Sequence, residues 1–255
     1  MLDYHGTIGL QYNPIAVAQY ALGHYNLSLE TNDENHLDQF SKQIVWLLEN
    51  LEKNDSGIYV WKHYFDFEYN QLLQNGWYAG LAQGQGLSAL IRAKGIVKDD
   101  RLDQAIDKVW QSLLLLIDQG GVSFRDEENS LWIEEYILEP PTHILNGFIW
   151  ALWGVYDLWL MNKETTTKSY FDECISTIKE NLPKYDSGYW SLYELSNTRM
   201  KMLASPFYHK LHIVQLKVLY KMTNDSFFNE YAEKWMGYLK NRLNRYRSLI
   251  NKSFF

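Results

Sequence analysis

The sequence is poor in the residues and segments that build several common classes of protein. It has one cysteine, Cys174, in 255 residues, so no disulfide can form within the chain and we expect this residue to fill the core. No stretch is long and apolar enough to cross a bilayer, and the N-terminal segment Met1–Tyr20 lacks the basic flank and continuous apolar run of a secretory signal. We therefore expect a cytoplasmic protein without a membrane span.

Basic residues are also scarce. The chain has 24 lysines and arginines against 31 aspartates and glutamates, which gives a formal net charge of -7. Because no basic stripe is available to neutralise phosphates, we expect no nucleic acid partner. The basic run from Lys240 to Lys252 fits a solvated helix end, whose cations suit the negative end of the helix dipole.

Low-complexity segments are absent as well. With 46% hydrophobic and 16% aromatic residues, the chain has enough apolar side chains for one sizeable core. No shift in composition marks a boundary, so we expect a single α/α-barrel-like domain over residues 1–255.

Three short turns recur along the chain at similar spacing. Each combines polar turn residues with a glycine and a following aromatic or β-branched residue, and the three are Asn54–Tyr59, Asp118–Phe124 and Tyr185–Trp190. Each follows a segment with one apolar stripe at helical spacing, and these segments are Leu37–Leu51, Ile106–Ile117 and Phe171–Leu182. The aspartates in the turns are expected to be structural, since Asp side chains bond to nearby backbone groups.

A more apolar helix is predicted after each turn. These helices are Trp77–Ile96, Thr142–Met161 and Pro206–Met222, and Pro14–Tyr25 is a fourth of the same kind. A helix that is apolar on most faces lies inside, whereas one with a single apolar stripe lies outside, so four inner helices alternate with four outer ones, of which Phe227–Asn241 is the last. The pattern predicts an all-α fold, a partial α/α toroid of four helical hairpins. Short β-hairpins are expected at its rim, for example at Gly57–Tyr64 and Gly188–Tyr193.

The stretch from Leu131 to Asp157 is the first candidate for chemistry. In it, Glu134, Glu135 and Tyr136 precede a double proline and then an aromatic-rich apolar helix. The prolines alone indicate only that one element ends and the next begins. An acid beside a tyrosine, at the start of an inner helix, is placed where a rigid scaffold can present reactive groups to a substrate.

Five ordered segments give the chain a resemblance to the C-terminal catalytic domain of the D-glucuronyl C5-epimerases, which act on heparan-type polysaccharides. The segments are Tyr12–Tyr25, Gly76–Ala93, Trp132–Tyr136, Leu145–Leu158 and Tyr208–Leu216. The family implies an α/α-barrel catalytic domain, in agreement with the repeat. Larger members carry a β-rich portion after the first inner helix. Here that portion is missing, so contacts with a long polymer are expected to be reduced.

The reaction that the resemblance implies is conversion of D-glucuronate to L-iduronate residues in a heparosan-like polysaccharide. The C5 proton is removed and a proton returns to the opposite face, so two acid–base groups must flank one carbon, and the charge of the developing enediolate must be offset. Matched to the family motifs, Tyr136 and Tyr208 are the expected catalytic pair, with Glu135 as a third acid–base or orienting group. No cofactor and no metal are expected.

Seven further residues are candidates for substrate binding. They are Tyr78, Gln83, Asn146, Tyr193, Arg199, His209 and His212. Tyr193 resembles the tyrosine of a family Tyr-Asp-Leu-Arg motif, but Ser196 stands where that motif has its arginine. Arg199 or Lys201 is therefore expected to replace the lost cation.

Two of these assignments have structural alternatives. His209 and His212 lie three residues apart on one helix face, a spacing that suits a metal, but no second ligand pair accompanies them, so substrate hydrogen bonding or helix packing is favoured. The segment Gln83–Gly86 lacks the lysine of a phosphate loop, and its glycines predict close helix packing.

Two other functions stay open beside an epimerase. A polysaccharide lyase begins with the same C5 proton abstraction and then expels the substituent at C4, and α/α toroids host such chemistry. A non-catalytic uronan-binding protein would use an aromatic surface without any reaction. In each case the expected partner is an anionic polysaccharide, and the sequence leaves open whether the chain forms a homodimer.

Overall fold

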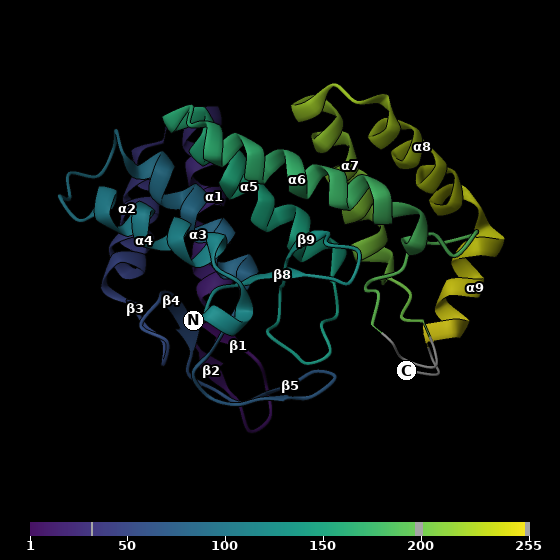
Figure 1. Ribbon diagram of the computed structural model, residues 1–255, viewed down its shortest axis with the longest axis horizontal. Coiled ribbons are helices and arrows are strands. Elements are labelled where there is room, and N and C mark those ends of the chain that lie inside the picture. The colour runs from purple at the N-terminus through teal and green to yellow at the C-terminus, as the bar shows by residue number, and fades with distance from the viewer. Residues whose placement is uncertain (32, 197–200, 253–255) are drawn as a thin grey trace.

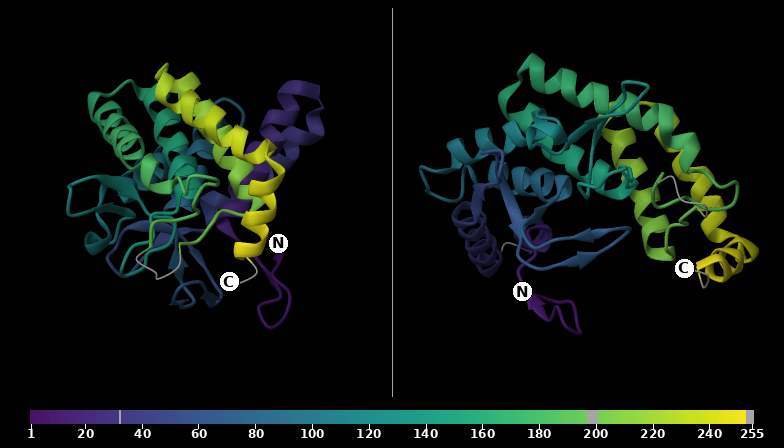
Figure 2. Two further views of the ribbon diagram at one scale, coloured as in Figure 1. Left: turned by 90° about the vertical axis from the view of Figure 1, so that its right-hand side faces the viewer. Right: turned by 60° about the horizontal axis from the view of Figure 1, so that its bottom comes forward.

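The chain folds into a curved row of helical hairpins in a computed structural model that describes residues 1–31, 33–196 and 201–252 (Figure 1). The inner helices are α1 (Pro14–Thr31), α3 (Gly80–Ala93), α5 (Leu145–Asn162) and α7 (Pro206–Thr223). The outer helices are α2 (Glu34–Glu49), α4 (Leu102–Leu114), α6 (Thr165–Asn181) and α8 (Ser226–Lys240). The row curves without closing into a ring (Figure 2), so the predicted partial α/α toroid of four hairpins is confirmed.

The basic C-terminal run forms a helix of its own. α9 (Arg242–Lys252) follows α8 after a break at Asn241, where the sequence predicted no more than a solvated helix end. No described helix combines the length and the apolar character needed to cross a membrane.

Short antiparallel strand pairs precede the inner helices α1, α3 and α5, at one end of the helices. They are β1 (Leu2–Asp3) with β2 (Leu10–Gln11), β3 (Leu51–Lys53) with β4 (Tyr59–His63) and β7 (Trp77–Tyr78), β5 (Phe67–Glu68) with β6 (Leu72–Leu73), and β8 (Ser123–Arg125) with β9 (Leu131–Ile133). Val60 lies opposite Glu52, which confirms strand pairing in the first predicted rim hairpin. The second, at Gly188–Tyr193, forms only isolated bridges, one between Ser191 and Asp186 and one between Leu192 and Leu203.

The three recurring turns share one backbone requirement. Gly57, Gly120 and Gly188 have φ angles of 80°, 86° and 84°, in the left-handed region that glycine adopts without steric cost. Two of the turns follow short 3₁₀ helices, η1 (Ile117–Gln119) and η2 (Leu182–Tyr185). In the third turn Asp186 Oδ1 accepts a hydrogen bond from the Gly188 amide at 2.7 Å, which confirms the structural role expected of this aspartate.

The core lies between the inner and outer helices. Outer helices bury one stripe, as α2 does with Phe40, Ile44 and Leu47, whereas α3 and α5 are buried over most of their surface. Cys174 lies in this core, as expected.

The two central inner helices approach each other closely at glycines. A Cβ atom added to Gly84 of α3 would lie 2.6 Å from the backbone carbon of Ala151 in α5, and one added to Gly154 would lie 2.8 Å from the backbone carbon of Gly84. The close helix packing predicted from the glycines is therefore confirmed. It fixes α3 and α5 in register, so the ends of these helices have defined positions.

Inner helices begin beside one short segment, Glu134–Glu135. The amide of Gly80, at the start of α3, donates to the Glu134 carbonyl at 2.9 Å. The start of α5 packs against the Glu135 side chain at Gly147, and the amide of Leu145 donates to the carbonyl of Tyr193 at 3.2 Å. The loops at the N-terminal ends of the inner helices are thereby attached to the rigid helices.

Candidate active site

Glu134 and Glu135 follow β9 directly and are both buried. Glu134 has partners for both carboxyl oxygens, since Oε1 lies 2.5 Å from His143 Nδ1 and Oε2 accepts from the His143 amide at 3.1 Å. Glu135 instead lies against α5, and its Oε2 has no hydrogen-bond partner among the described residues. Of the two acids, Glu135 is the one with an oxygen that a reacting group could use.

Burial sets the protonation of Glu135. Burial, with a smaller contribution from the neighbouring Glu134 and Glu194 carboxylates, raises the pKa of its carboxyl to about 8. A hydrogen bond from the Tyr136 hydroxyl acts in the opposite direction. A carboxyl with this pKa is mostly protonated at pH 7, with about a tenth ionised.

Tyr208 reaches the same region from the first turn of α7. The Ser205 side chain caps this helix by accepting a hydrogen bond from the Tyr208 amide at 3.2 Å. The rings of Tyr193 and Tyr208 lie 4.9 Å apart, and the Tyr193 hydroxyl donates to that of Tyr208. The charge of Glu135 raises the pKa of both tyrosines, so the three groups are within electrostatic reach of one another.

The structure thus brings together Glu135, Tyr136, Tyr193 and Tyr208, four of the residues predicted from the sequence; we call them the glutamate–tyrosine cluster. They come from the β9–α5 connection, from the segment before α7 and from α7 itself. Their catalytic and binding roles stay predictions.

Two residues that sequence reasoning missed adjoin the cluster. Tyr69, in the turn between β5 and β6, has its ring 4.9 Å from that of Tyr136, and its hydroxyl donates to the buried Glu194. The Asn70 side chain also donates to Glu194, at 3.2 Å. Glu194 could have been found from the sequence, because it directly follows the candidate Tyr193. No sequence signal pointed to Tyr69, because its turn has no counterpart in the repeat.

All the tyrosines here resist ionisation. Burial raises the pKa of Tyr69, Tyr136, Tyr193 and Tyr208, and nearby glutamates raise it further. A neutral tyrosine is a proton donor, so one that accepts a proton from substrate must pass its own proton to a partner. Glu135, hydrogen-bonded to Tyr136, is the partner within reach.

Three predicted substrate-binding residues lie in the core instead. Gln83 is fully buried and bonds to the Trp61 amide at 3.1 Å and to Ser112 Oγ at 2.6 Å. His209 and His212 are also fully buried, and their Nδ1 atoms lie 2.8 and 2.9 Å from Ser191 Oγ. Gln83 joins β4 and α4 to α3, and the two histidines join Ser191, in the segment before α7, to that helix, in agreement with the packing alternative for the histidines. Substrate contact by these three side chains stays a prediction.

The remaining predicted residues have varied positions. Asn146 is buried one residue before Gly147, and its Oδ1 has no hydrogen-bond partner among the described residues. Tyr78 lies elsewhere, with its hydroxyl 3.4 Å from the Gly120 carbonyl and beside the Asn54 turn. Arg199 lies outside the described residues, and Lys201 is exposed.

Cations contribute little to the cluster as described. The largest influences on the pKa values of Glu135, Tyr136 and Tyr193 are burial and neighbouring Glu and Tyr side chains. Within the described residues, no group of three or more His, Cys, Asp or Glu side chains could hold a metal ion.

Comparisons with known proteins identify the family and the fold. Residues 53–237 match the family model described as the D-glucuronyl C5-epimerase C-terminus. The D-glucuronyl C5-epimerase of Caenorhabditis elegans is 29% identical over 223 residues, which cover 80% of this chain and 35% of that protein. The chain therefore spans about a third of the length of that relative.

Two further relatives extend the comparison. An uncharacterized protein of Methanocaldococcus jannaschii is 28% identical over 92% of this chain and 81% of its own length. Among solved structures, cellobiose 2-epimerase from Bacillus thermoamylovorans superposes with a TM-score of 0.63 at 15% identity, over 90% of this chain and 60% of that one, which establishes a shared fold. Since the family model covers well over half of the sequence, the chain belongs to the family of the D-glucuronyl C5-epimerase C-terminal domain.

Proposed function

We propose that this protein is a uronyl C5-epimerase that converts D-glucuronate to L-iduronate residues in a heparosan-like polysaccharide. The observation that carries the proposal is the presence of two hydrogen-bonded pairs in one cluster, Glu135 with Tyr136 and Tyr193 with Tyr208. Inversion at one carbon needs a proton acceptor on one face and a proton donor on the other. Two pairs, carried by different segments of the chain, meet that need.

Glu135 and Tyr136 act together as the acceptor. The Tyr136 oxygen takes the C5 proton while the Tyr136 hydroxyl proton passes to the ionised Glu135 carboxylate. Charge is thereby moved from Glu135 to the substrate enediolate, and no isolated tyrosinate forms. A carboxyl with a pKa of about 8 suits this role, because proton transfer is most efficient when the pKa of the catalyst is near the working pH.

Tyr208 acts as the donor on the opposite face. Its hydroxyl proton goes to C5, and Tyr193, which donates to Tyr208, stabilises the oxygen left behind. After release of the product, Tyr208 regains a proton from water and Glu135 gives up the one that it received, which restores the starting state. In the reverse reaction the two pairs exchange roles. Asn146, with its free buried oxygen, and a cation from the segment of Arg199 and Lys201 are the proposed groups that orient the uronate.

Incubation with uronate polymers in heavy water tests the proposal. Heparosan is the first substrate, followed by other glucuronate- and iduronate-containing chains, and NMR follows deuterium at C5 and the ratio of epimers. We expect deuterium to enter C5 as iduronate appears. Lys42→Ala, on the outer face of α2, is the control variant and should behave like the wild type. Gln83→Glu is not a suitable control, because it would disturb the core.

Other outcomes distinguish the alternatives. An unsaturated product that absorbs in the ultraviolet would identify a lyase. Binding of a polymer without any exchange at C5 would identify a non-catalytic uronan-binding protein.

A further inference from the structure

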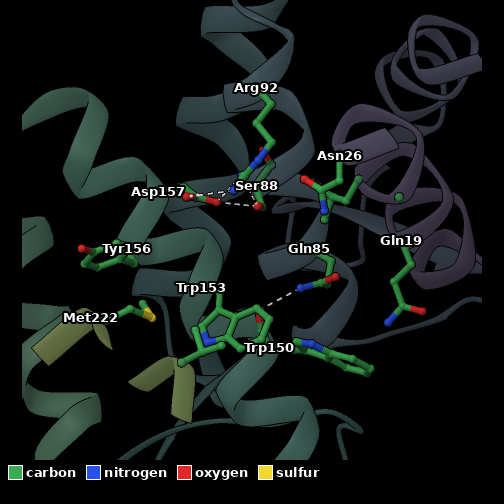
Figure 3. A pocket seen from close by; sticks show the side chains of 13 residues that line it. Gln19, Asn26, Gln85, Ser88, Arg92, Trp150, Trp153, Tyr156, Asp157 and Met222 are labelled. Carbon is green, nitrogen blue, oxygen red and sulfur yellow. Dashed lines mark hydrogen bonds and ion pairs between the residues drawn. The ribbon is translucent and has the colours of Figure 1, made fainter. Parts of the chain in front are cut away.

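A second site lies away from the glutamate–tyrosine cluster, between the four inner helices. It is a cavity of about 560 Å³ lined by residues of α1, α3, α5 and α7 (Figure 3). Its volume lies in the range of about 300–1,000 Å³ that is usual for small-ligand sites. Nothing in the proposed epimerase chemistry uses it.

The cavity is separated from the cluster along the helices. Gly147 of α5 touches Glu135, whereas Asp157, ten residues further along α5, lines the cavity. At 1.5 Å per residue, the Asp157 end of the cavity lies about 15 Å along α5 from Gly147, and Trp150, the lining residue of α5 nearest to the cluster, lies about 4.5 Å along the helix from it. The side chain of Gln215 in α7 donates to the Asn146 carbonyl at 2.9 Å and so joins α7 to the start of α5. No lining residue of the cavity belongs to the cluster, so we expect a ligand at the Asp157 end to bind without contact with a residue that reacts at the cluster.

The lining combines aromatic rings with amide side chains. Trp150, Trp153 and Tyr156 are half-buried, so part of each ring is exposed to the cavity, and Gln19 and Asn26 carry amides that both donate and accept hydrogen bonds. Figure 3 shows these side chains around one space. A pyranose ring has apolar C–H faces, which suit aromatic rings, and hydroxyls at its edge, which suit amides.

The charged groups of the lining cancel each other. Among the described residues around the cavity, the charged side chains are Arg92 and Asp157, which form an ion pair, with a second contact of 3.3 Å between Arg92 Nη2 and Asp157 Oδ1. The Ser88 hydroxyl bonds to both partners. An anionic ligand would find no unpaired cation here to offset its charge, whereas an uncharged ligand needs no such cation.

From this lining we infer that the cavity binds a neutral saccharide of one or two pyranose units. The reacting uronate belongs at the cluster, and the cavity takes an uncharged sugar. This is a binding function beyond the proposed epimerisation, and it does not depend on it.

A glycine in the lining allows a test that preserves the fold. Gly23 of α1 lines the cavity, and a Cβ atom added there meets no atom within 4 Å. Gly23→Leu should therefore fill part of the cavity without straining the helix. Gly237 of α8 is an exposed helical glycine with equally open surroundings, so Gly237→Leu is the matched control.

Binding is measured by isothermal titration calorimetry and by tryptophan fluorescence, with N-acetyl-D-glucosamine and cellobiose as neutral probes and D-glucuronate as the charged comparison. We expect a neutral probe to bind the wild type and Gly237→Leu alike, to bind Gly23→Leu at least about tenfold more weakly, and to be favoured over D-glucuronate by a similar factor. Thermal unfolding establishes that both variants are folded. Binding should also survive Tyr208→Phe, which alters the cluster alone.

Three results would overturn the inference. They are failure of both neutral probes to bind the wild type, equal binding to Gly23→Leu and the wild type, and loss of binding in Tyr208→Phe but not in Gly23→Leu. The last would assign the sugar to the cluster. Because no epimerase activity is measured, failure here leaves the proposed function standing, and the reverse also holds.

Discussion

Gly147 of α5 lies in direct contact with Glu135, so closely that a Cβ atom on this glycine would stand 2.8 Å from the Glu135 Cβ. Any larger residue would push the carboxyl away from α5. The absence of a side chain at position 147 therefore sets where the Glu135 carboxyl can lie relative to Tyr136.

The first prediction follows from this contact. Gly147→Ala should displace Glu135 and reduce the rate of epimerisation by about 100-fold, because a shift of about 1 Å in a catalytic group costs that much. The rate is measured as deuterium incorporation at C5. Gly237→Ala, at another helical glycine but with open surroundings, is the control and should keep the wild-type rate. A wild-type rate in Gly147→Ala would show that the position of Glu135 does not matter.

The second prediction concerns the two tyrosines. Tyr208→Phe should abolish net epimerisation while the fold is kept, because one hydroxyl is lost and the ring remains. Exchange at C5 should persist from one epimer only. Tyr136→Phe should give the complementary pattern with the other epimer. NMR of each polymer in heavy water measures both. If both variants epimerise at the wild-type rate, the roles given to the tyrosines are wrong.

The third prediction is a pH dependence. Only ionised Glu135 can receive the proton that Tyr136 passes on, and burial raises the pKa of Glu135 to about 8. The rate should therefore increase about tenfold per pH unit below 8 and level off above it. Initial rates between pH 6 and pH 9 measure this. A rate that is constant over the range would exclude Glu135 as the acceptor.

The fourth prediction concerns stability. Because the pKa of Glu135 in the fold, about 8, is above its ordinary value of 4.5, its protonated form is favoured in the folded state. The stability this gives is fully present below pH 4.5 and is lost as the pH rises through 8. Glu135→Gln, which stays neutral, should therefore be more stable than the wild type at pH 9, by up to about 5 kcal/mol, and similar to it at about pH 4. Urea unfolding at the two pH values measures the difference, and equal stabilities at pH 9 would contradict it.

The fifth prediction tests the packing of α3 on α5. The methyl group of Gly84→Ala would meet the backbone of Ala151, and such overpacking costs about 1–3 kcal/mol of the free energy of unfolding. Gly23→Ala should instead stabilise its helix by up to about 1 kcal/mol. Thermal or urea unfolding distinguishes the two, and a Gly84→Ala variant as stable as the wild type would mean that the helices can separate without cost.

The hairpin architecture was predictable because it depends on local patterns. The stripe of Phe40, Ile44 and Leu47 marks α2 as an outer helix, and nothing distant is needed to interpret it. The predicted start of α7 at Pro206 is also where the helix begins, since Ser205 and Pro206 are a cap and a first-turn residue of the preferred types.

The surroundings of the cluster were only partly predictable. Tyr136 and Tyr208 stand in segments with a recognisable pattern, whereas Tyr69 reaches Glu194 across 125 positions of sequence, and no local pattern reports such a contact. His209 and His212 illustrate the same limit. Their spacing was compatible with substrate binding or with helix packing, and local sequence could not show that both lie beside Ser191 inside the core.

The start of several inner helices beside Glu134 and Glu135 has an electrostatic consequence. A helix N-terminus carries a partial positive charge of about half a unit. The N-termini of α3, α5 and α7 all lie on the side of the molecule that carries the cluster. In the proposed reaction, with Ser196 at the position of the family arginine, part of the positive potential at the cluster would come from the backbone. That contribution is built into the scaffold, and no exchange of a single side chain removes it.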